Sequence, residues 1–323
     1  MPKLSILIAA RDEALLETSL VSVLQNRPPD CEILVVHDEG YQDPYELASE
    51  VRFIAAPAAS SELERLNRGV RHCQSSLVHI LRCGAEVTEG WTAAVLPHFA
   101  DPRVAAVAPL VLAPGSQSVV AAGIDYRAGG LRVACHGARQ ANELSAEPAP
   151  VLGPALSAAF YRVNALTLLR EPFCPSVGSN LADVDLALRL SRAGYRAVLE
   201  PRSQVLDAPK QSISPLTDAW LAERLYWRHA RHFGTGRTLA AHATVVAAEF
   251  AGCLVRPLRV GSVLGRAAGC LERMLFGATY TIPAPEPVEP PSPVRERTDL
   301  RVDSGTTGVR PQRPRRQNAP KVA

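Results

Sequence analysis

The sequence predicts an α/β fold in which a mainly parallel sheet is flanked by helices. Over the first 110 residues, short apolar runs rich in β-branched residues alternate with segments whose apolar residues recur at helical spacing. Such alternation is typical of parallel strands joined by crossover helices. The chain has 323 residues, 47% of them hydrophobic, so it can bury a sizeable core in one large or two modest domains.

The first βαβ unit consists of strands expected at 4–10 and 31–37 and the helix between them. Both strand segments are short, apolar and rich in β-branched residues. Between them, Leu16, Leu20 and Val23 recur at the spacing of one helix face. The chain therefore begins with a parallel pair of strands.

Later segments extend the same pattern. Ligands of open parallel sheets bind at the carboxyl ends of the strands, so the loops after Ala10, His37 and Leu81 are candidate binding loops. Further strands are expected at 51–56, 77–81 and 104–110, with helices at 60–73 and 91–99.

The segment from about 115 to 210 is less regular. Its expected elements are strands at 119–122, 155–160 and 195–199, and a helix at 183–192 that Gly194 ends.

The C-terminal third divides into helices and a tail. The helical segment carries arginines between its apolar residues, and we expect these helices to pack on the domain with their arginines in water. Contact of the basic helices with a membrane surface is the alternative. The tail holds nine of the 27 prolines and almost no large apolar residues, so a disordered segment rich in Pro and Arg is expected. The predicted boundaries are 1–212 for the α/β domain, 213–281 for the helical extension and 282–323 for the tail; the arginines are Arg224, Arg228, Arg231, Arg256, Arg259, Arg266 and Arg273.

Charge, cysteine content and hydropathy limit the partners and the location. The net charge of +3 comes from the tail, where eight basic residues face five acidic ones, and a neutral body gives no reason to expect a nucleic-acid partner. Seven cysteines without a C-x-x-C spacing fit a reducing cytoplasm. No apolar stretch is long enough for a signal-peptide core or a bilayer span. We expect a cytoplasmic protein, with the periphery of the inner membrane face as the alternative.

Common catalytic motifs are absent from the sequence. There is no G-x-G-x-x-G, Walker loop or G-x-S-x-G. His229 and His232 form an H-x-x-H on a predicted helix, but two ligands do not define a metal site, so we expect a surface pair.

Five segments, in the same order along the chain, resemble the family 2 glycosyltransferases. The resemblance covers about residues 3–210 and is weaker to about 276. It implies a GT-A-type, Rossmann-like fold, a nucleoside-diphosphate-sugar donor, inverting transfer, and an acceptor that is a glycan, a lipid or a protein. The segments are LSILIAARDE, CEILVVHDEG, LNRGVRHC, GWTAAVLPHFADPRVAAVAPLV and ADVDLALRLSRAGYRAVLEP, of which the last is the most specific.

The chain departs from the family at the metal-binding triplet. In the family, a D-x-D ending the strand before Gly-Trp binds a divalent metal on the donor diphosphate, whereas Arg82, Cys83 and Gly84 stand there in this chain. Mg²⁺ and Mn²⁺ prefer oxygen ligands, so the triplet cannot hold them in the usual way and no metal site is assigned. Glu86, two residues further on, is a substitute ligand if the register slips.

Two interpretations of Arg82 stay open. In the first, its guanidinium pairs with the donor diphosphate and supplies fixed positive charge in place of the metal. In the second, it is a solvated or ion-paired residue of a site that no longer binds a donor.

The resemblance also implies donor-binding residues. Asp12, Asp38 and Asn67 match donor-binding segments of the family. Asp38 contacts the nucleoside in this interpretation; in the alternative it caps a turn with Gly40.

Three further carboxylates match the end of the resemblance. Asp183 corresponds to the family's general base, which takes the proton of the acceptor hydroxyl, although it would alternatively be an ordinary helix N-cap. Asp185 does not share its helix face and stands four residues before Arg189, which favours a structural ion pair. Asp207 replaces the family's late His.

Two functions are therefore predicted. The first is a glycosyltransferase that works without the usual metal, and the second is a catalytically inactive relative that binds a nucleotide, a glycan or a protein partner.

Overall fold

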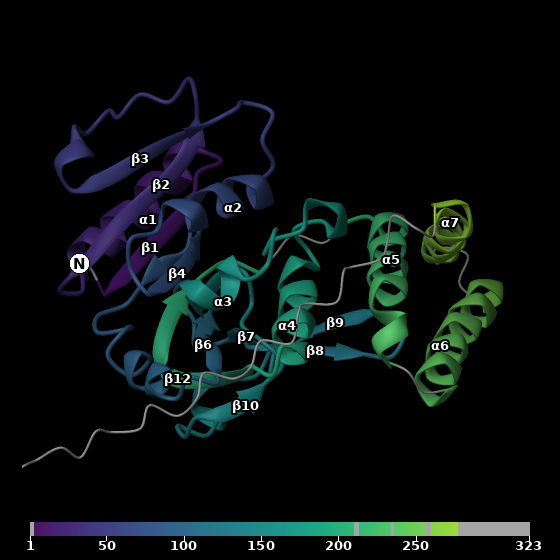
Figure 1. Ribbon diagram of the computed structural model, residues 1–323. Helices are drawn as coiled ribbons and strands as arrows, with labels where there is room; N and C mark the ends of the chain where they lie inside the picture. The colour runs from purple at the N-terminus through teal and green to yellow at the C-terminus, as the bar shows by residue number, and fades with distance from the viewer. Residues whose placement is uncertain (1–2, 210–212, 234–235, 256–259, 277–323) are drawn as a thin grey trace, which may run out of the picture. The chain divides into compact units, whose positions relative to one another are not determined.

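The computed structural model describes residues 3–209, 213–233, 236–255 and 260–276 (Figure 1). The tail expected at 282–323 lies outside the described residues.

A large mixed sheet forms the centre of the fold. Its main path runs in the order β10-β12-β6-β11-β4-β1-β2-β3, while β5 pairs with β12 and β7 pairs with β6. A separate hairpin joins β8 and β9. The strands are β1 (Leu4–Ala9), β2 (Cys31–Asp38), β3 (Val51–Ala56), β4 (Leu77–Arg82), β5 (Glu86–Val87), β6 (Val104–Leu112), β7 (Val119–Ala122), β8 (Ile124–Arg127), β9 (Leu131–Ala134), β10 (Ala149–Val151), β11 (Ala158–Arg162) and β12 (Arg196–Leu206).

The sheet is mainly parallel, as predicted. Strands β3, β2, β1 and β4 pair in parallel, and so do β6 and β12. Since β11 runs antiparallel to both β4 and β6, six of the eight strands in the main path share one direction. Their carboxyl ends therefore meet at one edge of the sheet, where ligands of such sheets bind.

Helices connect the strands and begin at capping residues where the sequence supplies them. Asp12 caps α1 by accepting a hydrogen bond from the Leu15 amide at 3.1 Å, and Ser61 forms a capping box with Glu64 at the start of α2. The helices are α1 (Glu13–Gln25), α2 (Glu62–His72), α3 (Val163–Thr167), α4 (Ala182–Arg192), α5 (Pro215–Phe233), α6 (Gly236–Val255) and α7 (Val260–Phe276), with short 3-10 turns at Leu47–Ser49, Leu96–Ala100, Ala141–Glu143 and Pro175–Val177.

Several elements differ from the sequence prediction, which did not include β5, β10 or α3. The helix expected at 91–99 is a series of turns ending in the 3-10 segment Leu96–Ala100, because Pro97 has no N–H to donate to an α-helical ladder. The β8–β9 hairpin was not predicted; its turn contains Gly129 and Gly130, which both adopt positive φ.

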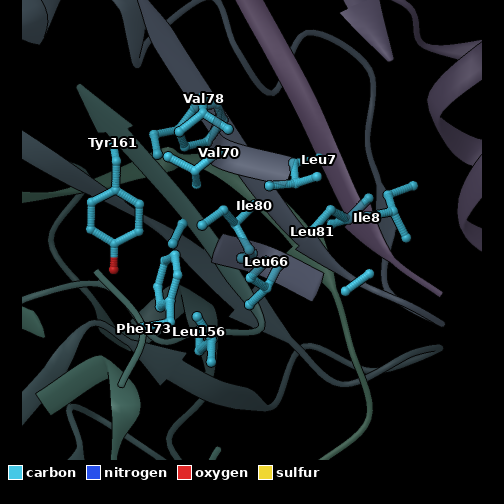
Figure 2. Packing of buried hydrophobic residues seen from close by; sticks show 14 of the residues in the cluster. Leu7, Ile8, Leu66, Val70, Val78, Ile80, Leu81, Leu156, Tyr161 and Phe173 are labelled. Atoms are coloured by element: carbon cyan, nitrogen blue, oxygen red, sulfur yellow. The ribbon is translucent and has the colours of Figure 1, made fainter. Parts of the chain in front are cut away.

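The core lies between the sheet and its flanking helices. Figure 2 shows Leu7 and Ile8 of β1 beside Ile80 and Leu81 of β4, with Leu66 of α2 in the same cluster. All five side chains are buried. The alternation of apolar runs in the sequence thus produces a large main core, and a smaller second cluster forms around Leu110 and Leu112 of β6.

One histidine lies inside this core. His79 of β4 is fully buried and packs against Phe160, with ring centroids 3.9 Å apart and the rings tilted by 32°. Neither ring nitrogen has a hydrogen-bond partner among the residues that the structure describes. Burial disfavours the charged imidazolium and lowers the pKa of His79 to about 3.

We predict that His79→Phe makes the protein less sensitive to acid. The unfolded chain takes up a proton on this histidine near pH 6.5, whereas the folded chain does not until about pH 3. The contribution of His79 to the free energy of unfolding is therefore fully present above pH 6.5. Below that pH, it falls by about 1.4 kcal/mol per pH unit. In urea unfolding between pH 7 and 4.5, the free energy of unfolding of the variant should rise relative to that of the wild type as the pH falls. A constant difference across this range would contradict the prediction.

Helices α5 and α7 pack closely through glycines. Gly261, Gly265 and Gly269 are spaced four residues apart and so share one face of α7. A Cβ on Gly265 would lie 2.2 Å from the Leu216 carbonyl oxygen, and one on Gly269 would lie 2.7 Å from Glu223 Cβ. The backbones approach so closely that a side chain at Gly265 requires α5 to move.

We predict opposite effects for two Gly→Ala changes in α7. Alanine favours a helix interior by up to about 1 kcal/mol over glycine. Gly261→Ala should be neutral or stabilising, because its Cβ would lie 3.5 Å from the nearest atom, an ordinary contact. Gly265→Ala should lower the free energy of unfolding by about 1–3 kcal/mol. Thermal denaturation of both variants measures this, and equal midpoints would contradict the close packing.

The expectation that the C-terminal arginines lie in water is wrong for three of them. Arg224 pairs with Glu272 at 3.5 Å, and its side chain is 16% exposed. Arg228 pairs with Asp185 at 2.9 Å, and Arg266 pairs with Glu223 at 3.2 Å and Glu249 at 3.1 Å. Arg266 is only 2% exposed. The helices bury these arginines because carboxylates on facing elements supply the opposite charge. Within the described residues, no helix has both the length and the apolar character that crossing a bilayer requires.

Candidate active site

A cavity of about 1040 Å³ lies at the carboxyl ends of β1, β4 and β12. This is the edge of the sheet at which the sequence predicted a binding site. Its other walls come from β7, the β8–β9 hairpin, the start of α4 and α5 (Figure 1). Seven charged residues line it: Arg11, Asp12, Glu62, Arg82, Arg132, Asp183 and Asp207.

Half of the predicted site residues meet in this cavity. Four of the eight line it: Asp12, Arg82, Asp183 and Asp207. The other four are not among its lining residues: Asp38, Asn67, Glu86 and Asp185.

Arg82 stands at the end of β4 and is fixed by two acceptors. Its Nη2 donates to Asp207 Oδ1 at 2.5 Å and to the Ala208 carbonyl oxygen at 2.7 Å. Burial raises the pKa of Asp207, and the Arg82 guanidinium opposes that rise. Arg82 is thus ion-paired, as its second interpretation allows, and lines the cavity, as its first interpretation requires.

Asp183 is nearly fully buried and is held by an arginine of the unpredicted hairpin. Arg132 of β9 donates from Nη2 to Asp183 Oδ2 at 2.7 Å and from Nε to both oxygens at 3.0 and 3.1 Å. Burial lowers the pKa of Arg132, but Asp183 more than offsets this, so the net shift is upward. The two side chains form a forked ion pair on the cavity wall.

Asp183 is not the N-cap of its helix. Leu181 occupies the N-cap of α4, and Asp183 lies inside the first turn. Its carboxylate accepts from the amides of Val184 at 2.9 Å and Leu156 at 3.3 Å. The capping interpretation is therefore wrong, and the carboxylate is turned toward the cavity instead.

Asp185 occupies the other side of α4. It pairs with Arg189 at 2.9 Å, as predicted, and also with Arg228 and His229 of α5 at 2.9 and 2.8 Å. Burial alone would raise the pKa of Asp185, but these partners lower it well below its usual range. His229 is fully buried, so the expected surface pair is wrong for this residue. The side chain of His232 lies outside the described residues.

Asp38 and Asn67 have other contacts. Asp38, at the end of β2, pairs with Arg65 at 2.6 Å, and the turn after it closes through the backbone, from Tyr41 N–H to the Asp38 carbonyl oxygen at 3.0 Å. Asn67 donates to the Phe173 carbonyl oxygen at 2.6 Å and accepts from the Phe173 amide at 3.0 Å. Both ends of the Asn67 amide thus join α2 to the segment before α4.

Asp12 and Glu86 are positioned by local structure. Asp12 lines the cavity while capping α1. Glu86 lies in β5, where it pairs with Leu206 of β12. The register does not slip so as to bring Glu86 into the cavity.

Sequence reasoning missed two arginines of the cavity. Arg132 belongs to the β8–β9 hairpin, whose Gly129-Gly130 dipeptide between short polar strands is the signal that could have found it. Arg11 follows β1 and has no ion pair with a carboxylate within the described residues.

Comparison with solved structures shows a GT-A fold. The structure of GalNAc-T7 with UDP, GalNAc and Mn²⁺ matches with a TM-score of 0.53 and 12% identity, over 71% of this chain and 50% of that chain. This chain therefore spans about half the length of that structure. The mannosyltransferase PcManGT from Pyrobaculum calidifontis, in complex with GDP-Man and Mn²⁺, matches with a TM-score of 0.48 and 17% identity, over 84% of this chain and 87% of that chain. No protein-family model and no curated protein sequence matches the chain.

The fold class predicted from the sequence is thus confirmed. The chain has the α/β GT-A fold, with a mostly parallel central sheet. Membership of family 2 stays a prediction.

The residues at the strand end do not fit the divalent metal that the fold family implies. Within the described residues, no three His, Cys, Asp or Glu side chains gather where they could hold a metal ion. The guanidinium of Arg82 stands at this strand end, and its charge opposes a cation. No step proposed below depends on a metal.

We predict that Asp185 supports the fold rather than the chemistry. Asp185→Asn leaves Arg189, Arg228 and His229 without a buried counter-charge, which should lower the free energy of unfolding by about 3–5 kcal/mol. Glu143→Gln is the control, because its ion pair with Arg139 is about half exposed and should contribute less than about 1 kcal/mol. Urea denaturation compares the two, and similar losses would contradict the structural role.

Proposed function

We propose that the chain transfers a sugar from a nucleoside-diphosphate donor to an acceptor hydroxyl, with inversion and without a divalent metal. The observation that carries this proposal is that Asp183 and Arg82 line one cavity at the carboxyl ends of the strands of a GT-A fold. Cavities of several hundred to about 1000 Å³ are typical of small-molecule sites, and this one has about 1040 Å³.

Asp183 is the proposed general base. It would take the proton of the acceptor hydroxyl as that oxygen attacks the anomeric carbon. The bond between the anomeric carbon and the donor phosphate oxygen breaks at the same time, and the nucleoside diphosphate leaves with the electron pair. Attack opposite the leaving group inverts the anomeric configuration. One positioned carboxylate is sufficient for this proton transfer.

Arg82 is the proposed partner of the donor diphosphate. Its guanidinium has five N–H donors. Two hydrogen bonds from Nη2 are described, to Asp207 and to Ala208. These contacts fix a planar donor group at the strand end, where it can face phosphate oxygens. Asp12 on the same wall and Asp38 at the end of β2 are the proposed contacts for the rest of the donor, and Asn67 supports the segment before α4.

A catalytically inactive binder is the second candidate. Two observations favour it: the Asp183 carboxylate is occupied by Arg132, and no metal-ligand cluster occurs in the part of the chain that the structure describes. A protein of this kind would bind a nucleotide, a glycan or a protein partner in the same cavity without turnover.

We predict that Asp183→Asn abolishes transfer while the fold persists. The amide cannot accept the proton, so the rate of nucleoside diphosphate release should fall by at least about a hundredfold. The measurement is release of free UDP, GDP or TDP from matched nucleotide sugars with an acceptor panel of glycans and lipids. Asp125→Asn is the matched control, since Asp125 lies on the hairpin outside the cavity lining and should keep wild-type turnover. Unchanged turnover in Asp183→Asn would refute the base.

Metal dependence is tested in the same assay. Turnover should persist in EDTA, because Arg82 supplies the positive charge near the diphosphate. A strict requirement for Mn²⁺ would refute the role of Arg82. Nucleotide binding without any turnover, across all donors, would favour the inactive binder.

A further inference from the structure

The Asp183 carboxylate has no vacant acceptor position in this state. Arg132 Nε and Nη2 approach one side of it, at 2.7 to 3.1 Å. The amides of Val184 and Leu156 bond to it at 2.9 and 3.3 Å. A carboxylate offers about four lone-pair sites, and these four N–H groups fill them.

A general base must have a free lone pair for the acceptor hydroxyl. The two backbone amides belong to α4 and to the buried segment before β11, so they cannot leave without local unfolding. Arg132 is a side chain and can leave by rotation. Once it leaves, the two amides still hold the carboxylate in place. Arg132 is therefore the one of these donors whose departure exposes the base and preserves its position.

Arg132 cannot simply lose its partner. Its side chain is 24% exposed, and burial lowers the pKa of its guanidinium unless a negative charge lies beside it. Leaving a largely buried guanidinium unpaired is unfavourable, so a second anion must replace Asp183. The donor diphosphate is the strongest anion that the proposed reaction brings into the cavity, and its oxygens match a forked guanidinium.

The charge balance of the cavity leads to the same partner. The lining holds three arginines and four carboxylates, and two of the arginines, Arg82 and Arg132, are already paired with Asp207 and Asp183. A diphosphate therefore enters a cavity without excess positive charge. Arg11 has no ion pair within the described residues, so it can contribute directly; Arg82 and Arg132 can give the diphosphate an unshared positive charge only by leaving their carboxylates.

We propose that Arg132 exchanges partners during the reaction: it pairs with Asp183 in the free protein and with the donor diphosphate in the complex, so that donor binding frees the base. This inference rests on the proposed function and deepens it. It makes Arg132 a donor-binding residue and requires the donor to bind before the acceptor can be deprotonated.

The test measures the affinity of UDP, GDP and TDP in EDTA by titration calorimetry. Asp183→Asn should bind the preferred nucleotide at least about tenfold more tightly than the wild type, because Arg132 no longer has a competing carboxylate. Arg132→Gln should bind it at least about tenfold more weakly. The double variant should show little of the gain, since the gain requires the arginine.

Glu62→Gln is the control for loss of a negative charge alone. Glu62 lines the same cavity and has no ion pair with an arginine within the described residues. Its effect on affinity should be less than about threefold. Circular dichroism establishes that each variant is folded; if Asp183→Asn is not, Arg132→Gln alone decides, and unchanged affinity in that variant overturns the exchange.

The outcomes separate the inference from the function on which it rests. A gain in Asp183→Asn that is equally large in the Arg132→Gln background, or equally large in Glu62→Gln, overturns the exchange while nucleotide binding stands. Absence of nucleotide binding by the wild type and by every variant overturns the proposed function itself.

Discussion

The pairing of buried carboxylates with guanidinium groups is the interaction on which both the site and its support depend. In α4, Asp183 and Asp185 stand two residues apart and face opposite sides of the helix. Asp185 joins α4 to α5 through Arg228 and His229, while Asp183 holds the β8–β9 hairpin through Arg132. One turn of helix thus fixes the cavity wall on one side and the C-terminal helices on the other.

Most of the sheet could be predicted because its signal is local. Strands such as β3 (Val51–Ala56) and β7 (Val119–Ala122) are apolar runs bounded by polar or turn residues, and they occur where the pattern placed them. The β8–β9 hairpin was missed because its strands are short and only partly buried. At 91–99 the error is the opposite one, because the apolar spacing indicated a helix that does not form. Pro97 lacks the N–H that an α-helical ladder requires there.

The site could be predicted only as far as strand ends and motif positions determine it. The carboxyl ends of β1, β4 and β12 form the cavity, as parallel topology requires. The partners of the charged groups were beyond reach, because Arg132 and Asp183 are separated by 51 residues, and Arg82 and Asp207 by 125. Arg228 and Arg266 were predicted to lie in water because their carboxylate partners are also distant in the sequence. The fold buries both arginines among these carboxylates.

These pairings would allow a formally neutral body to contain the proposed anion site. Each positive charge that burial would make unfavourable is matched with a carboxylate, so the cavity needs no excess of basic residues to stay stable. The same matching is what the proposed exchange requires, since a stronger bidentate anion can replace a carboxylate at small net electrostatic change. Within the described residues no cluster of metal-ligating side chains stands beside these pairs, and Arg82 is held by Asp207 at the end of β4. In the proposed exchange, the positive charge of Arg132 would move from the proposed base Asp183 to the substrate, so that one ion pair of the free protein would become a contact of the complex.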